Sequence, residues 1–202
     1  MSDYYFTIEE RTEFEIKINK SRFIANVIPV NNVEEAKEEY DKIKKKYYDA
    51  SHNCFAWRFG ESGLDFRYSD DGEPKNSAGK PILFTISKYD FSDILVVVTR
   101  FFGGKKLGVG GLVRAYSEAA EEALKLCTKK QIDITQKVKV FTTYEDLNTI
   151  KSLLDTYAVS SEEFYTDLID ITAHIPVSKV EEFTDQITQK TNARSGFRVF
   201  EK

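Results

Sequence analysis

The sequence predicts an α+β protein of two domains, residues 1–131 and 132–202, and three observations support this prediction. Segments that alternate apolar and polar residues, as strands do, are interspersed with segments whose apolar residues recur at helical spacing. These segments follow a regular order after residue 131 and a less regular one before it. Charge divides at nearly the same place, with 21 Lys+Arg against 21 Asp+Glu up to Lys130 and 8 against 12 beyond it.

The front domain opens with two expected strands within residues 14–30, which meet at the turn Asn19-Lys20. An amphipathic helix is expected over 33–49, because its apolar residues fall on one stripe. A further strand is expected over 93–102, and between 33–49 and this strand lie an aromatic run, a turn-rich stretch and a short apolar segment. A glycine-rich loop and a second helix follow. The residues expected on the buried side of that helix are Leu112, Tyr116, Ala119, Ala123 and Cys127.

The back domain reads as strand, helix, strand, strand, helix, strand, which is the order of a ferredoxin-like split βαβ domain. Asp167 is expected at the turn between its second and third strands. Ser178 and Glu181 have the spacing of a capping box, which predicts that the last helix begins there. His174 lies on an alternating strand, and we interpret it as a half-buried structural histidine.

Composition narrows the class of protein. With 41% hydrophobic and 13% aromatic residues the chain can bury substantial cores, and no run of about eighteen apolar residues predicts a membrane span. The acidic N-terminal segment lacks the features of a signal peptide, so we expect a cytoplasmic protein with Cys54 and Cys127 as reduced thiols. A net charge of -4 excludes a nucleic-acid footprint over the whole surface, although a local cationic patch stays possible.

The first candidate site is the stretch from Arg100 to Ser117, which holds five of the ten glycines, two lysines, two arginines and no carboxylate. A glycine-rich turn between a strand and a helix can direct backbone N–H groups at an anion, and phosphate is the natural ligand. The spacing matches neither a P-loop nor a dinucleotide fingerprint. Alternatively the glycines serve only packing and positive φ. The candidate anion-binding residues are Arg100, Gly103, Gly104, Lys105, Lys106, Gly108, Gly110, Gly111 and Arg114.

A possible second site combines two further stretches. His52 and Cys54 would share one face of a strand, which suggests either an activated thiolate or, as we favour, a buried cysteine beside a hydrogen-bonded histidine. The loop around Asp70 and Glu73 suggests a magnesium site, ordinary turns, or a structural clamp that pairs with the cationic loop by charge. No metal and no cofactor are expected. The residues of this second set are His52, Cys54, Asp70, Asp71, Glu73 and Lys80.

Four segments of the front domain together resemble, in order and spacing, the motifs of the IMPACT (YigZ-like) family. They are FIANVIPVNNVEEA, DASHNCFAWRFG, SDDGEPKNSAGKPIL and VVVTRFFGGKKLGVGGLVRAYS. The resemblance covers about residues 14 to 127, and the back domain is similar to the small C-terminal domain of bacterial members. One departure is Lys75-Asn76-Ser77, where the family usually has Ser-Gly-Thr.

The resemblance implies an N-terminal fold similar to domain 2 of ribosomal protein S5, and a C-terminal domain similar to domain V of elongation factor G. Eukaryotic relatives regulate translation initiation by competing for the activator of a starvation-sensing kinase. We therefore expect a non-enzymatic regulator of translation that binds RNA, the ribosome or a translation-associated protein through the cationic segment, with no membrane partner.

Two alternatives stay open. An enzyme or binder of a phosphorylated small molecule or nucleotide would require the candidate residues to line one concave pocket, whereas a flat cationic surface would favour RNA. A protein-interaction module would require an exposed apolar patch.

Overall fold

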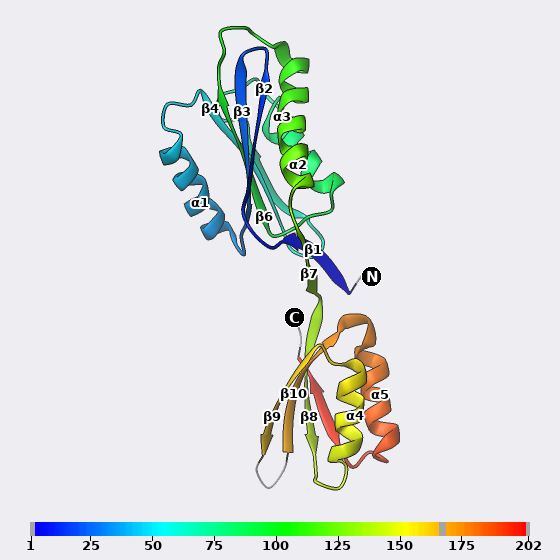
Figure 1. Ribbon diagram of the computed structural model, residues 1–202. Coiled ribbons are helices and arrows are strands. Elements are labelled where there is room, and N and C mark those ends of the chain that lie inside the picture. The colour runs from blue at the N-terminus through cyan, green and yellow to red at the C-terminus, as the bar shows by residue number, and fades with distance from the viewer. Residues whose placement is uncertain (1–2, 166–168, 201–202) are drawn as a thin grey trace. The chain divides into compact units, whose positions relative to one another are not determined.

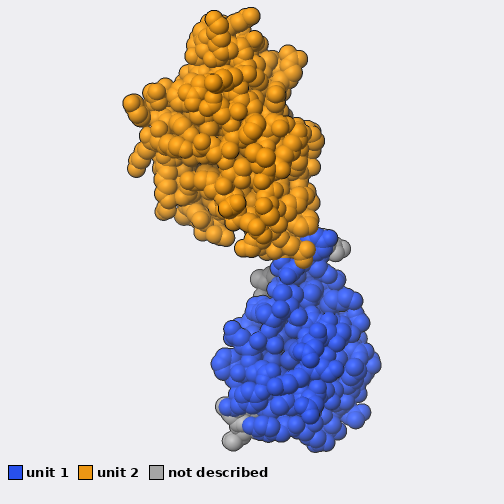
Figure 2. Space-filling view, in the orientation of Figure 1, with its two compact units in different colours: residues 1–4, 133–202 blue, residues 5–132 orange. Residues whose placement is uncertain are grey.

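The computed structural model describes residues 3–165 and 169–200. The chain divides into two compact units, residues 5–132 and residues 1–4 with 133–202 (Figure 2). The division expected from the sequence, 1–131 and 132–202, differs in leaving the N-terminal residues with the front domain, and it stays a prediction. In the part of the chain that the structure describes, no helix has both the length and the apolar character needed to cross a membrane.

A five-stranded sheet forms the centre of the unit of residues 5–132, and its neighbouring strands are antiparallel. The two expected strands at the start are confirmed, and the turn between them holds Asn19 and Lys20 at φ of 49° and 68°, the left-handed conformations typical of a two-residue hairpin. In sheet order the strands are β2 (Thr12–Ile18), β3 (Ser21–Pro29), β6 (Ile94–Phe101), β4 (His52–Phe59) and β5 (Asp65–Ser69).

Helices cover both faces of this sheet. Helix α1 (Val33–Lys46) lies on one face, and α2 (Gly79–Lys88) and α3 (Gly108–Lys125) lie on the other (Figure 1). Strand β6 is therefore buried on both sides, which explains its nearly continuous apolar run. Two further strands, β1 (Tyr4–Ile8) and β7 (Lys129–Asp133), pair with each other in a separate two-stranded sheet.

Helix α3 begins earlier than the sequence suggested. Its first residue is Gly108, so three of the five glycines in the cationic stretch, Gly108, Gly110 and Gly111, belong to the helix. The loop between β6 and α3 is reduced to residues 102–107. Helix α2 was not assigned from the sequence, where its residues formed only a short apolar segment.

The unit of residues 1–4 and 133–202 has the predicted order of elements. Its strands lie in the order β11-β8-β10-β9, all neighbours antiparallel, which together with the βαββαβ order is the ferredoxin-like arrangement. Its elements are β8 (Thr135–Thr142), α4 (Leu147–Tyr157), β9 (Ser160–Tyr165), β10 (Ile169–Pro176), the 3-10 turn η1 (Val177–Lys179), α5 (Val180–Lys190) and β11 (Gly196–Val199).

Two sequence-based details of this unit were wrong. Helix α5 begins at Val180 without a side-chain cap, because Ser178 lies in η1 and bonds to Asp3 instead of capping the helix with Glu181. His174 is exposed rather than half-buried, since it lies on the face of β10 opposite the buried Ala173 and Ile175. The turn expected at Asp167 lies outside the described residues.

Candidate anion-binding pocket

Arg100 is held at the end of the central strand β6. The strand pairs Arg100 with Phe23 of β3 on one side and with His52 of β4 on the other. Its guanidinium group lies between two aromatic rings, 5.5 Å from the centroid of Phe23 and 5.4 Å from that of Phe102. Arg100 is buried, and its Nε atom is buried without a hydrogen-bond partner among the described residues. This nitrogen is therefore a buried donor that the fold leaves unsatisfied.

Glu73 is the partner of Arg100. Its Oε1 atom accepts hydrogen bonds from Arg100 Nη1 at 2.6 Å and from the Tyr116 hydroxyl at 2.7 Å, and it lies 4.0 Å from His52 Nε2. The Glu73 side chain is 3% exposed and that of Arg100 is 6% exposed, so the pair is desolvated. The hypothesis that the acidic loop and the cationic segment pair by charge is thus confirmed for these two residues.

The two aspartates of the acidic loop accept hydrogen bonds from backbone N–H groups. Asp70 Oδ1 accepts the N–H groups of Ala78 and Gly79 at the start of α2, and its Oδ2 accepts the N–H of Asn76. Asp71 Oδ2 accepts the N–H of Asn53. Among the described residues no group of three or more His, Cys, Asp or Glu is placed to hold a metal ion.

His52 and Cys54 do share one side of β4, but the structure gives them separate partners. His52 Nδ1 lies 2.8 Å from the carbonyl oxygen of Asp71, a contact that directs Nε2 toward Glu73. The Cys54 thiol donates to the carbonyl of Asp70 and is fully buried. Burial raises the pKa of the Cys54 thiol, which disfavours a thiolate nucleophile. The interpretation of Cys54 as a buried cysteine is confirmed.

The glycines of the cationic stretch have different roles. A Cβ on Gly103 would lie 2.0 Å from the carbonyl carbon of Lys20, so Gly103 is required for packing against the β2–β3 turn. Gly104 and Gly108 have φ of +85° and +72°. Gly110 is required neither for close packing nor for a positive φ. A Cβ built at Gly110 would have open space around it. Its open space lies at the first turn of α3.

The N-terminus of α3 has unused hydrogen-bond donors. No side chain caps it, and its first turn contains no acidic residue. The first N–H groups of a helix lack intrahelical acceptors, and the helix dipole adds a partial positive charge at that end. The eighteen-residue α3 therefore presents donors and positive potential at the residues that follow the loop.

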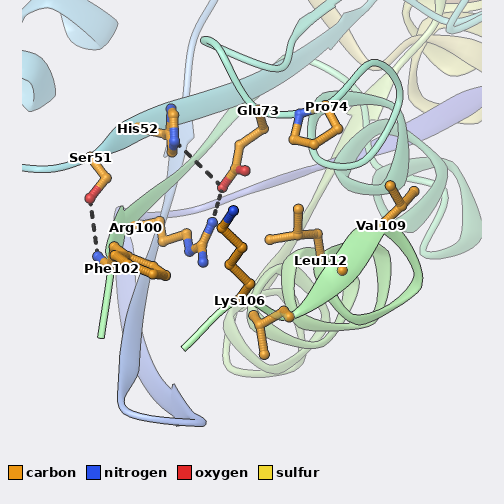
Figure 3. A pocket seen from close by; sticks show the side chains of 11 residues that line it. Ser51, His52, Glu73, Pro74, Arg100, Phe102, Lys106, Val109 and Leu112 are labelled. Carbon is orange, nitrogen blue, oxygen red and sulfur yellow. Dashed lines mark hydrogen bonds and ion pairs between the residues drawn. The ribbon is translucent and has the colours of Figure 1, made fainter. Parts of the chain in front are cut away.

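These features meet at one pocket of about 530 Å³ (Figure 3). Arg100 and Glu73 lie on one side, and Lys106 extends its side chain from the β6–α3 loop toward them. Much of the remaining wall is apolar. The lining residues are Ser51, His52, Glu73, Pro74, Arg100, Phe102, Lys106, Leu107, Gly108, Val109 and Leu112.

The structure brings together some of the predicted site residues and separates others. Of the first set Arg100, Lys106 and Gly108 line the pocket, and of the second set His52 and Glu73 do. The others do not line it: Gly103, Gly104, Lys105, Gly110, Gly111, Arg114, Cys54, Asp70, Asp71 and Lys80.

Sequence reasoning did not find the apolar wall. Val109 and Leu112 were assigned to the loop and to the buried helix face, and Pro74 to a turn. The available signal was limited: Pro74 follows Glu73 and Leu107 follows Lys106, both charged candidates, whereas Val109 and Leu112 follow only glycines. Whether these apolar side chains line the pocket depends on how α3 packs against the β5–α2 loop, which the sequence alone does not show.

The fold and the pocket together define an α+β protein of two units, with a cationic, glycine-flanked pocket in the unit of residues 5–132. The chain belongs to the IMPACT family, as the sequence motifs predicted: residues 19–124 match the model of the Impact N-terminal domain, and residues 140–194 match that of a domain of unknown function, DUF1949.

Relatives match over most of their length. The IMPACT family member YvyE of Bacillus subtilis is 35% identical over 96% of this chain and 90% of its own. The IMPACT family member YigZ of Escherichia coli is 34% identical over 85% of each chain. A crystal structure of a hypothetical protein superimposes with a TM-score of 0.70 at 28% identity and covers the whole of both chains.

Proposed function

We propose that the unit of residues 5–132 binds a phosphorylated ligand of about nucleotide size in this pocket, without catalysing its conversion. The observation that carries the proposal is that Arg100, Lys106 and the N-terminus of α3 all face one concavity. Guanidinium, ammonium and helix N–H groups are the donors that proteins use for phosphate.

The charge balance of the pocket favours an anion. Glu73 engages Arg100 through Nη1, and Arg100 makes no ion pair with any other carboxylate of the described residues. Lys106 makes no ion pair within 4.0 Å with any described carboxylate. The single carboxylate that lines the pocket is therefore outnumbered by two cations before the helix N-terminus is counted.

The apolar wall favours an organic group attached to that phosphate. Phe102 is half exposed, and Leu107, Val109 and Leu112 line the same cavity. A volume of about 530 Å³ lies within the roughly 300–1,000 Å³ of small-molecule pockets. Phe102 offers a ring face on which a nucleobase could stack.

Binding of RNA or the ribosome is a second candidate, and a different observation favours it. Lys105 and Arg114 are exposed beside the pocket, and neither pairs with a described carboxylate. Both could contact phosphates of a longer strand that places one nucleotide in the pocket. The regulation of translation implied by the family resemblance is the process in which we expect either ligand to act.

A protein-interaction role is supported by exposed apolar side chains near β5 and α2. Leu64 is 78% exposed and Phe84 is 72% exposed, with Phe66 also exposed on β5. Exposed apolar side chains that form one contiguous patch mark interaction surfaces in soluble proteins. This observation is independent of the pocket.

Two neighbouring lysines distinguish the first two candidates. Lys106 lines the pocket and Lys105 does not, although both are exposed in the same loop. Binding of adenosine 5′-monophosphate, uridine 5′-monophosphate and inorganic phosphate to the full chain is measured by calorimetry, with adenosine as the uncharged control. Co-sedimentation with ribosomes and total RNA over a salt series is measured in parallel.

The expected result is that Lys106→Ala weakens nucleotide binding at least tenfold and Lys105→Ala changes it less than twofold, since each lost charge-assisted contact to phosphate is worth roughly 1.5–3 kcal/mol. Salt-sensitive RNA binding that Lys105→Ala and Arg114→Ala weaken as much as Lys106→Ala would support the second candidate. If the wild-type chain binds none of the three small ligands, the pocket proposal fails.

A further inference from the structure

The unit of residues 1–4 and 133–202 has a sheet face that its own helices leave uncovered. Figure 1 shows α4 and α5 on the same side of the sheet of β8, β9, β10 and β11. Val138 and Val140 of β8 are buried against those helices, so Lys137, Lys139 and Phe141, which alternate with them, face the other way. We call the residues on this opposite side the open face.

Strand register arranges the open face in three rows. Phe141 lies between Gly196 of β11 and Asp170 of β10, and Asp170 lies beside Phe164 of β9. Lys139 lies between Arg198 and Thr172, with Glu162 beyond. Lys137 lies beside His174 and Ser160, and its carbonyl accepts the N–H of Phe200.

Charge is distributed unevenly between the open face and the rest of this unit. The open face carries three cations, Lys137, Lys139 and Arg198, against two carboxylates, Glu162 and Asp170. The remaining described residues of 135–200 carry four Lys+Arg against seven Asp+Glu. Lys139 and Asp170 form an ion pair at 2.7 Å and offset each other, which leaves Lys137 and Arg198 against Glu162. The open face is thus the cationic side of an otherwise acidic unit.

Aromatic rings accompany these cations. Phe164 is 58% exposed, and Phe141 and Phe200 are partly exposed. Lys139 Nζ lies 5.2 Å from the centroid of the Phe141 ring, and Lys137 Nζ lies 5.2 Å from that of Phe200. Flat rings held between cations on a rigid sheet are the features that bind unpaired bases and their phosphates.

We propose that the open face binds single-stranded nucleic acid, with Phe141, Phe164 and Phe200 stacking on bases and Lys137, Lys139 and Arg198 contacting phosphates. Four strands about 4.8 Å apart span roughly 14 Å, which accommodates two to three stacked nucleotides. Stacking tolerates any base, so binding shows little sequence preference. The proposal concerns other residues than the pocket and stands independently of its ligand.

The test measures binding of the full chain to a fluorescent single-stranded twelve-nucleotide oligouridylate by anisotropy, with a duplex of equal length for comparison. The charge variant is Lys137→Glu with Arg198→Glu. Its matched control is Lys179→Glu with Lys190→Glu, which makes the same change of net charge at two exposed lysines of η1 and α5. Phe164→Ala tests stacking, and Lys106→Ala tests the pocket.

The single strand is expected to bind more tightly than the duplex, with a logarithmic salt slope of about -2 for three phosphates. The open-face charge variant should lose at least tenfold in affinity and the control variant less than threefold. Phe164→Ala should lose at least fivefold with an unchanged salt slope, and Lys106→Ala should have no effect. The proposal is overturned if the wild-type chain does not bind, if both charge variants lose affinity equally, or if only Lys106→Ala weakens binding.

Discussion

Arg100 and Glu73, 27 positions apart in the sequence, form an ion pair in which both side chains are more than nine-tenths buried. The pair joins the end of β6 to the loop before α2, and it forms part of the wall of the pocket. Removing one partner of a buried pair leaves an uncompensated charge, which is far more destabilising than losing an exposed pair. Glu73 therefore affects both the stability of this unit and the electrostatics of the pocket.

Glu73→Gln is expected to lower the free energy of unfolding by up to about 3–5 kcal/mol, because Arg100 loses its counter-charge. Inorganic phosphate should raise the melting temperature of this variant more than that of the wild type, since the anion then supplies the missing negative charge. Thermal unfolding by circular dichroism, with and without phosphate, measures both effects.

The matched control is Glu121→Gln, which removes a partly exposed carboxylate paired with Lys88 at 3.0 Å and with Lys125 at 3.7 Å. Exposed pairs contribute about 0–1 kcal/mol, so little change is expected. An equal phosphate response in Glu73→Gln and the wild type would contradict the assignment of Arg100 to anion binding.

Gly110→Ala is expected to raise stability and to leave ligand binding nearly unchanged. A Cβ at this position has open space around it, so alanine fits and can raise the free energy of unfolding by up to about 1 kcal/mol through its higher helix propensity. Gly110 does not line the pocket, so the added methyl group lies outside the space in which we place the anion. Urea unfolding and phosphate titration test this; a tenfold loss of phosphate affinity in Gly110→Ala would mean that the anion lies beside Gly110 and not in the pocket.

Much of the fold could be predicted because the spacing of apolar residues along the sequence reflects which side of each helix or strand is buried. Helix α1, with its single apolar stripe, and β6, with its continuous apolar run, were both visible in the sequence. Helix α2 was not, because ten residues that begin with Gly79 and contain Pro81 resemble a turn followed by a strand. Its N-terminus depends on Asp70, nine positions before Gly79, and that contact exists only once the loop has folded.

The candidate site was predictable in its charged residues and not in its shape. Arg100 and Lys106 stood out because no carboxylate lies near them in sequence. The pairing of Glu73 with Arg100 and with Tyr116 depends on tertiary contacts 27 and 43 positions apart along the chain. The concave shape of the pocket follows from those contacts. From the sequence we could predict only that a concave site would favour a small phosphorylated ligand.

Asp70→Ala is expected to destabilise the chain by a few kcal/mol, on the basis of about 1–3 kcal/mol for each buried donor left without a partner. It removes the acceptor for the N–H groups of Asn76, Ala78 and Gly79. If Asp70 is a cap rather than a metal ligand, magnesium and a chelator should leave the melting temperatures of the wild type and the variant unchanged. A magnesium-dependent rise that Asp70→Ala abolishes would restore the metal hypothesis.

The stability of the chain should decline in alkaline solution because of Cys54. Burial raises the pKa of its thiol in the folded state, whereas an unfolded cysteine has a pKa of about 8.5. Below that value both states keep the proton, and the thiol has no effect on the pH dependence. Above it the unfolded chain releases the proton and the folded chain does not, so the free energy of unfolding falls by up to about 1.4 kcal/mol per pH unit.

Urea unfolding between about pH 7.5 and 9.5, below the tyrosine range, isolates the cysteines. The pKa of Cys127 is also raised by burial, but Cys127 is less buried than Cys54. Cys54→Ala should therefore flatten the alkaline decline more than Cys127→Ala does, whatever each substitution does to stability at neutral pH. An unchanged slope in Cys54→Ala would mean that this thiol ionises as readily in the folded chain as in the unfolded one.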